Sequence, residues 1–246
     1  MLGKLSFLNN NSIKIIACLS MLIDHIGLML FPSVAIFRII GRIAMPLFAF
    51  CIAQGCKYTK NKLKYFLMVF LLGAICQTVY FIVSPTSVYF GILITFSFSI
   101  LLIYALQYIK KCFFESGVKV ANKILSIVIF AVLGAGVYLF CRNFRVDYGF
   151  MGCLIPVICS LTDFKGVNTS EAVKKIDNLF TQFLCFVLAM LFYYYKSTSM
   201  FSVFSLASII FVLLYNGKRG KLNLKYLFYV FYPLHLVVLE GISYLI

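Results

Sequence analysis

Long apolar runs restrict the fold of this chain more than any other feature. Runs of about 17 to 25 apolar residues, long enough to cross the hydrocarbon core of a bilayer, recur along the whole sequence between short polar breaks. Hydrophobic residues make up 63% of the 246 residues and charged residues 12%, unlike a soluble domain of this size. Because backbone polar groups inside lipid must be paired within the protein, each run is expected to be a helix. The sequence therefore predicts an all-α, polytopic helical membrane protein.

The polar breaks divide the chain into about nine transmembrane helices within a single domain, residues 1–246. The predicted spans are residues 12–31, 33–56, 64–83, 88–108, 123–141, 146–162, 178–195, 199–216 and 224–246. The first span follows lysines and could be mistaken for a secretory signal. It contains Asp24 and His25 and is followed by FPS, without a small-residue cleavage site, so we expect it to be a membrane helix.

Basic side chains are concentrated in alternate breaks. The lysine-rich breaks contain Lys57, Lys60, Lys62 and Lys64; Lys110, Lys111, Lys119 and Lys123; Lys165, Lys174 and Lys175; and Lys218, Arg219, Lys221 and Lys225. By the positive-inside rule, this alternation predicts a cytoplasmic N-terminus and a multi-pass membrane protein. Topology and anionic lipid then account for the net charge of +15, and we expect no nucleic acid partner.

One break departs from this alternation. The segment CRNFRVDYG places Arg142 and Arg145 on the predicted outer side. If the following segment, which contains Pro156, only re-entered the membrane, the lysines at 165–175 would also lie outside, which violates the rule more severely. We therefore expect a full span here, with the two arginines held by Asp147 or by a charged substrate.

Ionisable residues lie within the first two spans. An ionisable group at the centre of a span costs roughly 2.5 to 3.5 kcal/mol or more, so it needs a partner and usually has a function. At 1.5 Å per residue, Asp24 lies about 12 Å below the outer end of its helix, and Arg38 and Arg42 lie about 8 and 14 Å below the same end. The acid, the neighbouring His25 and both arginines therefore share a depth. An ion pair that only fixes helix packing remains the alternative for Asp24.

Histidine occurs twice, at His25 and His235, each inside an apolar span. An imidazole in a dry pocket suits a general base, whereas a core histidine bonded to a carbonyl is the structural alternative for both. Tyr232 and His235 are three residues apart and share a helix face. Pro233, between them, leaves the Tyr229 carbonyl without its helical donor. The scattered cysteines and the two isolated histidines give no metal-ligand spacing, so no metal site is expected.

Four sequence blocks together resemble the TraX family, named for the protein that N-acetylates F-type conjugative pilin. The blocks are IKIIACLSMLIDHIG, FRIIGRIAMPLFAFCIAQG, DYGFMG and KYLFYVFYPLHL, and the similarity spans nearly the whole chain. More distantly, the pattern is similar to integral membrane acyltransferases that acetylate surface polysaccharides. The resemblance implies transfer of an acetyl group from cytosolic acetyl-CoA to an amine or hydroxyl acceptor at the outer face.

On this resemblance His25 would deprotonate the acceptor, and Arg38 and Arg42 would stabilise the thioester oxyanion or bind coenzyme phosphates. Asp24 would orient His25 or hold an arginine. Adjacent helix positions point about 100° apart, so we expect Asp24 to pair with an arginine rather than with His25. The rest of the substrate pocket would be Tyr232, His235, Asp147, Arg142 and Arg145.

The implied donor is anionic and cytosolic. Lys57, Lys60 and Lys62, together with Arg42, could meet its phosphates, although ordinary positive-inside lysines are the better explanation of each of the first three. The acceptor could be a peptide or pilin N-terminus or a surface glycan. Two other classes stay open: a proton-coupled secondary transporter, because intramembrane Asp, His and Arg also build relays, and a noncatalytic scaffold of a conjugation or secretion apparatus.

Overall fold

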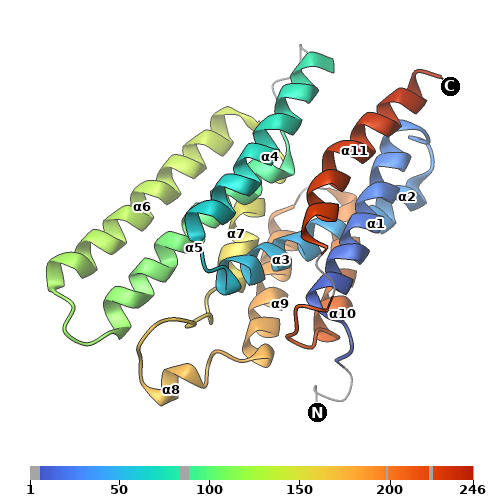
Figure 1. Cartoon of the computed structure of the whole chain (residues 1–246). Helices are drawn as coiled ribbons and strands as arrows, with labels where there is room; N and C mark the ends of the chain where they lie inside the picture. Colours follow the sequence, from blue (N-terminus) through green and yellow to red (C-terminus); the bar gives the residue numbers. More distant parts are fainter. Residues whose placement is uncertain (1–5, 84–88, 198, 222–223, 246) are drawn as a thin grey trace. The chain divides into compact units, whose positions relative to one another are not determined.

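The computed structural model describes residues 6–83, 89–197, 199–221 and 224–245, and these are mainly helical (Figure 1). The α-helices are α1 (Asn10–Met29), α2 (Ala35–Gly41), α3 (Ala44–Tyr58), α4 (Lys62–Val83), α5 (Ile92–Phe114), α6 (Val120–Asn143), α7 (Gly149–Cys159), α8 (Glu171–Lys174), α9 (Leu179–Lys196), α10 (Ser208–Leu213) and α11 (Lys225–Ser243). The remaining elements are the 3₁₀-helix η2 (Met200–Ala207) and the short strands β1 (Tyr89–Phe90) and β2 (Arg145–Val146).

In the described ranges, six helical stretches are long and apolar enough to cross a membrane. They are Asn10–Met29, Ala35–Tyr58, Lys62–Ile82, Ile92–Phe114, Val120–Asn143 and Leu179–Lys196. The three other predicted spans coincide with shorter apolar helical stretches, Gly149–Cys159, Met200–Leu213 and Val230–Ser243. The predicted all-α membrane class is confirmed, whereas the count of nine spans and the cytoplasmic N-terminus remain predictions.

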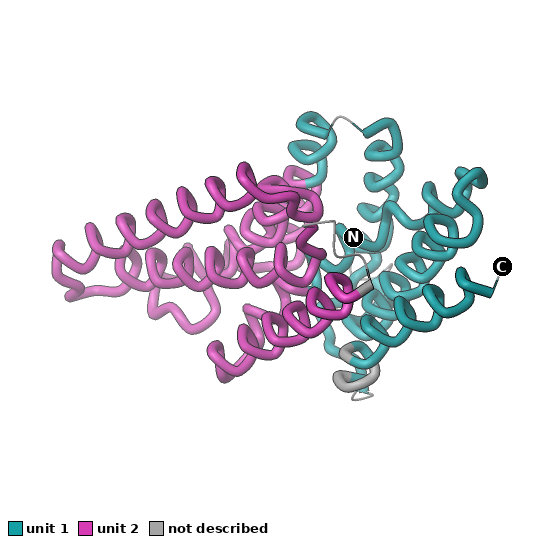
Figure 2. Tube along the Cα trace, turned by 90° about the horizontal axis from the view of Figure 1, so that it is seen from above, with its two compact units in different colours: residues 1–51, 190–246 teal, residues 52–189 magenta. Residues whose placement is uncertain are grey.

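The chain packs as two compact units (Figure 2). The first unit contains residues 1–51 and 190–246, and the second contains residues 52–189. Whether they act as the single domain predicted from the sequence remains a prediction. Each unit buries its own apolar side chains, such as Leu47 in the first and Ile103 in the second, both with no exposed surface.

In the first unit, α1 packs against both α2 and α11 (Figure 1). Asn9 caps α1 by accepting the Ser12 N–H at 3.0 Å, which satisfies a donor that the helix start would otherwise leave free. Further along α1, the Lys14 ammonium lies 5.5 Å from the ring centroid of Phe228 on α11. These contacts bring the first and last helices of the chain together.

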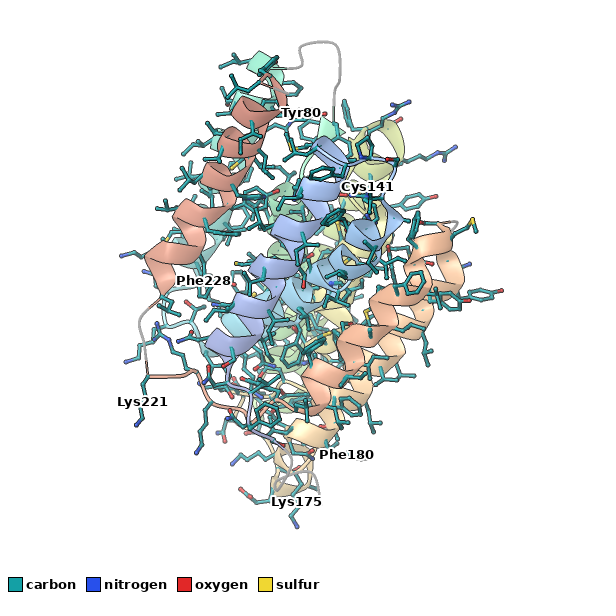
Figure 3. The ribbon with its side chains drawn as sticks, turned by 90° about the vertical axis from the view of Figure 1, so that its right-hand side faces the viewer. Tyr80, Cys141, Lys175, Phe180, Lys221 and Phe228 are labelled. Atoms are coloured by element: carbon teal, nitrogen blue, oxygen red, sulfur yellow. The ribbon has the colours of Figure 1, made fainter. Side chains whose placement is uncertain are left out.

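In the second unit, α5 packs against α4, α6 and α7. At one end, β1 and β2 pair in parallel. The Gln77 side chain on α4 holds β1 in place by donating to the Tyr89 carbonyl at 2.6 Å. Figure 3 shows Tyr80 and Cys141 toward this end of the unit, and Lys175 and Phe180 toward the other. Lys175, in one of the lysine-rich breaks, therefore lies toward the end of this unit that is away from Tyr80.

Candidate functional site

Asp24 on α1 is the centre of a cluster of charged side chains in the first unit. Its Oδ2 accepts from Arg38 Nη1 at 2.7 Å, and its Oδ1 accepts from Arg42 Nη2 at 3.2 Å. Arg38 Nη1 also lies 3.5 Å from the Asp24 carbonyl. The expected pairing of Asp24 with the arginines is therefore present, and it involves both of them.

A break in the second predicted span positions the arginines. Pro46, in the first turn of α3, has no N–H to donate to the Arg42 carbonyl, so α2 and α3 are separate helices here. The Arg42 N–H bonds to the Ile39 carbonyl at 3.3 Å, three residues back. The Arg38 carbonyl, left without that donor, accepts the Nε–H of Arg42 at 3.3 Å. The break thus ties the Arg42 guanidinium to the main chain of Arg38.

Glycines allow α1 and α2 to approach this closely. A Cβ atom on Gly41 would collide with Asp24, meeting its Cγ at 2.5 Å, and a Cβ atom on Gly27 would collide with Phe37. The Asp24, Arg38 and Arg42 side chains are only 16%, 25% and 15% exposed. One carboxylate and two guanidinium groups leave a formal charge of +1 in a poorly hydrated place, which favours an anion or a developing negative charge.

His25 and His235 face each other beside this cluster. Their ring centroids lie 4.9 Å apart, and the ring planes meet at 73°. Nδ1 of His25 is 2.8 Å from the Met21 carbonyl, and Nδ1 of His235 is 2.9 Å from the Phe231 carbonyl. A carbonyl only accepts hydrogen bonds, so Nδ1 carries the proton in both rings, and each neutral imidazole has its lone pair on Nε2.

The two imidazoles differ in their surroundings. His25 is half-buried, whereas His235 is 5% exposed and its Nε2 is buried without a hydrogen-bond partner. The Phe231 ring stacks on His235 at 5.2 Å, and the Tyr232 ring meets it edge to face at 5.7 Å. The structure thus brings together the sequence-predicted residues Asp24, His25, Arg38, Arg42, Tyr232 and His235.

The other predicted substrate residues belong to the second unit. Arg142 and Arg145 are exposed, and Asp147 is half-buried after β2. The Asp147 backbone is anchored because its N–H donates to the Phe90 carbonyl and its carbonyl accepts from Thr95 Oγ1, both at 2.8 Å. Their part in a site with the histidines remains a prediction.

The three predicted donor-binding lysines are also in the second unit and differ from one another. Lys57 is mostly buried and forms an ion pair with Asp177, so its charge is already balanced within the protein. Lys60 is exposed, and the exposed Lys62 has its ammonium 5.3 Å from the Tyr104 ring centroid. Of the three, Lys60 and Lys62 are accessible to a coenzyme phosphate.

A second buried polar cluster lies around Lys57, and its acidic members were not predicted. Lys57 Nζ is 3.9 Å from Asp163 Oδ1, and Lys110 Nζ donates to the Ser160 and Asp163 carbonyls at 2.6 and 2.7 Å. Gln182 donates to Asp177 at 3.0 Å. Burial raises the pKa of the Asp163 carboxyl above its ordinary value of 3.8.

A sequence signal for this cluster exists. Gln54 and Lys57, and likewise Gln107 and Lys110, are three residues apart at the ends of predicted spans and so share helix faces. Lys110 was interpreted from the sequence as a determinant of topology, and Lys57 as a determinant of topology or a ligand of the coenzyme phosphates. Polar pairs at helical spacing inside an apolar run indicate a buried polar face as well.

Comparisons with known proteins place the chain in a family. A family model described as TraX protein matches residues 9–243. An uncharacterized protein of Rickettsia prowazekii (strain Madrid E) is 60% identical over 38 residues, which is 15% of this chain and 15% of that protein. The chain therefore matches only a small part of that relative's length. No solved structure matches the chain.

Proposed function

The chain belongs to the TraX family, and from this premise we propose that it is an integral membrane acetyltransferase of the bacterial plasma membrane. It transfers an acetyl group from cytosolic acetyl-CoA to an amine or hydroxyl acceptor at the outer face. The observation that carries the proposal is the contact of His25 with His235, 4.9 Å between centroids, beside a charged cluster of net charge +1.

His25 provides the base in this reaction. Its Nδ1 is held by the Met21 carbonyl at 2.8 Å, which fixes the ring and leaves Nε2 to accept a proton. When the acceptor nitrogen or oxygen attacks the thioester carbonyl, its proton passes to this Nε2. The half-buried position of His25 gives an acceptor access while it limits the water around the reaction.

Arg38 and Arg42 stabilise the negative charge that develops on the thioester oxygen. Arg38 donates to Asp24 only through Nη1, so the N–H groups on its Nε and Nη2 take no part in these bonds. Asp24 fixes both guanidinium groups before the reaction begins, and fixed donors stabilise an oxyanion better than mobile ones. Asp24 is therefore a positioning residue rather than the base.

The substrates define the remaining roles. We assign Lys60 and Lys62, both exposed, to the coenzyme phosphates as point charges. We assign Tyr232 and His235 to substrate binding, because His235 contacts His25 and Tyr232 packs against His235. Acceptor binding at the outer face is assigned to Asp147, Arg142 and Arg145. A pilin or other peptide N-terminus, or a surface glycan, is the acceptor class.

Purified protein incubated with labelled acetyl-CoA and an amine-bearing peptide tests the proposal. We expect label in the peptide and a loss of at least 100-fold in His25→Ala, because general base catalysis contributes about 10²- to 10⁴-fold. Ser99→Ala is the control, because Ser99 is fully buried in the second unit and bonds only to its own helix at 3.1 Å. Absence of transfer and of coenzyme binding in folded wild-type protein would refute the catalytic role.

A proton-coupled transporter is the second candidate, and the buried charges of the second unit favour it. Lys57, Lys110, Asp163 and Asp177 form a connected polar path, of the kind that also carries protons. Protein in vesicles with a pH gradient would then take up a solute, and Asp163→Asn would stop the uptake. Uptake without any acetyl transfer would reverse the order of the two proposals.

A further inference from the structure

We propose that His25 and His235 form an acid–base pair that carries one proton between them, with His25 as the base and His235 as the acid that protonates the leaving thiolate. This inference rests on the proposed acetyl transfer. It assigns His235 the role of general acid, in addition to the substrate-binding role given above.

The hydrogen bonds of the two rings leave the same nitrogen free in both. Each Nδ1 donates to the carbonyl four residues back, at 2.8 Å for His25 and 2.9 Å for His235. Two neutral imidazoles therefore present two Nε2 lone pairs and no Nε2 proton. Such a pair cannot form a hydrogen bond between its rings until one proton is added.

The separation of the rings suits a shared proton. A linear N–H···N bond of ordinary length places two imidazole centroids roughly 5 Å apart, and the observed separation is 4.9 Å. The Nε2 of His235 is buried without a partner, and leaving a buried polar atom unpaired is unfavourable. A proton bound between the rings would remove this cost.

Burial distinguishes the two roles. His25 is half-buried and can meet an acceptor, whereas His235 is 5% exposed and enclosed by Phe231 and Tyr232. A buried cation without a counter-ion is costly, so a protonated His235 gives up its proton readily. The charged groups that act on the pair are Asp24, Arg38 and Arg42, next to His25.

The reaction starts after the pair has taken up one proton from water, which resides on Nε2 of His235, and from this state it balances as follows. The acceptor N or O forms a bond to the carbonyl carbon, the C–S bond breaks, the acceptor proton moves to Nε2 of His25, and the thiolate takes the proton from Nε2 of His235. The products are the acetylated acceptor and the free thiol. The proton on His25 then passes to His235 across the pair, which restores the starting state without an external acid or base.

Leaving-group dependence tests the assignment. The donors are acetyl-CoA and S-phenyl thioacetate, whose thiophenolate leaves without protonation, and each variant is compared with wild type on the same donor. The variants are His25→Asn and His235→Asn, because the Asn amide keeps a donor near the Nδ1 position and removes Nε2. We expect the rate of acetyl transfer by His235→Asn to fall at least 100-fold with acetyl-CoA and less than tenfold with S-phenyl thioacetate. For His25→Asn we expect the rate to fall by similar factors with both donors.

The second measurement is the pH dependence of kcat with acetyl-CoA. If wild type does not accept S-phenyl thioacetate, this measurement by itself tests the roles of the two histidines. A base must be deprotonated and an acid protonated, so His25→Asn should lose the acidic limb of the profile and His235→Asn the alkaline limb. Equal losses with both donors, or an unchanged alkaline limb in His235→Asn, would overturn the assignment. Wild type that transfers from neither donor would instead refute the proposed function.

Discussion

Gly41 lies directly against the side chain of Asp24, so close that a Cβ atom on the glycine would meet the Asp24 Cγ at 2.5 Å. The glycine is needed for space at this point, because α2 must approach α1 for both guanidinium groups to reach one carboxylate. A methyl group here would separate the helices or displace the carboxylate. The charged cluster therefore depends on a residue that takes no part in its hydrogen bonds.

Gly41→Ala should destabilise the protein by about 1–3 kcal/mol through overpacking, despite the better helix propensity of alanine. It should also lower the proposed acetyl transfer, because the arginines lose their common anchor. The chain has no tryptophan, so circular dichroism of the thermal unfolding in detergent is the suitable measurement.

Gly134→Ala and Gly136→Ala are matched controls, because a Cβ atom at either position on α6 would have nothing within 4 Å. They should be neutral or stabilising by up to about 1 kcal/mol. If Gly41→Ala behaves as these two do, the close approach of α1 and α2 does not exist in the protein.

A double-mutant cycle on Asp24 and Arg38 should reveal their coupling. Asp24→Asn leaves two guanidinium groups without a counter-ion in a poorly hydrated place, so we expect a loss of about 3 kcal/mol. Adding Arg38→Gln should recover part of this loss, with a coupling energy of about 1–3 kcal/mol in the free energy of unfolding. Additive effects of the two substitutions would show that the ion pair is absent in solution.

The membrane class and the pairing of Asp24 could be predicted because both depend on local features. Apolar runs of fixed length define the helices, and the short connection between the first two spans makes them antiparallel neighbours. Depth along each helix follows from residue count alone, which brings Asp24 level with Arg38 and Arg42. The break at Pro46 was not predicted, although the proline is its cause.

Contacts between distant parts of the sequence could not be predicted in the same way. The meeting of His25 with His235 depends on α11 packing against α1, and a single sequence contains no signal for which helices become neighbours. The ion pair of Lys57 could not be predicted for the same reason. From the sequence, this lysine was interpreted as a determinant of topology or as a ligand of a coenzyme phosphate. Its partner Asp177 lies far along the chain, beyond the lysine-rich break.

The stability of the second unit should depend on pH through Asp163. Burial raises the pKa of this carboxyl above 3.8. The folded state then binds the proton more tightly than the unfolded state. The protonated carboxyl therefore makes its full contribution to the free energy of unfolding below pH 3.8, and this contribution is lost as pH rises through the folded pKa. Each unit of raised pKa corresponds to about 1.4 kcal/mol. Asp163→Asn should match wild type at low pH and become relatively more stable as pH rises.

The groups that face Asp163 are Lys57, Lys110 and Asp177. Other carboxyl groups titrate in the same range, so the quantity to follow is the difference in unfolding free energy between the variant and wild type. A difference that stays constant, or that moves in favour of wild type as pH rises, would contradict a raised pKa.

Reporter fusions should settle which end of the second unit faces the cytoplasm. Gly117 lies between α5 and α6 with open space around it, in a break flanked by Lys110, Lys111 and Lys119. A green fluorescent protein fused after Gly117 should fluoresce, because lysine-rich breaks face inward. Alkaline phosphatase fused after Asn143, at the end of α6, should be active, because that enzyme needs the oxidising outer compartment to form its disulfides. The reverse pattern would place the N-terminus outside, and Lys60 and Lys62 could then no longer bind a cytosolic coenzyme.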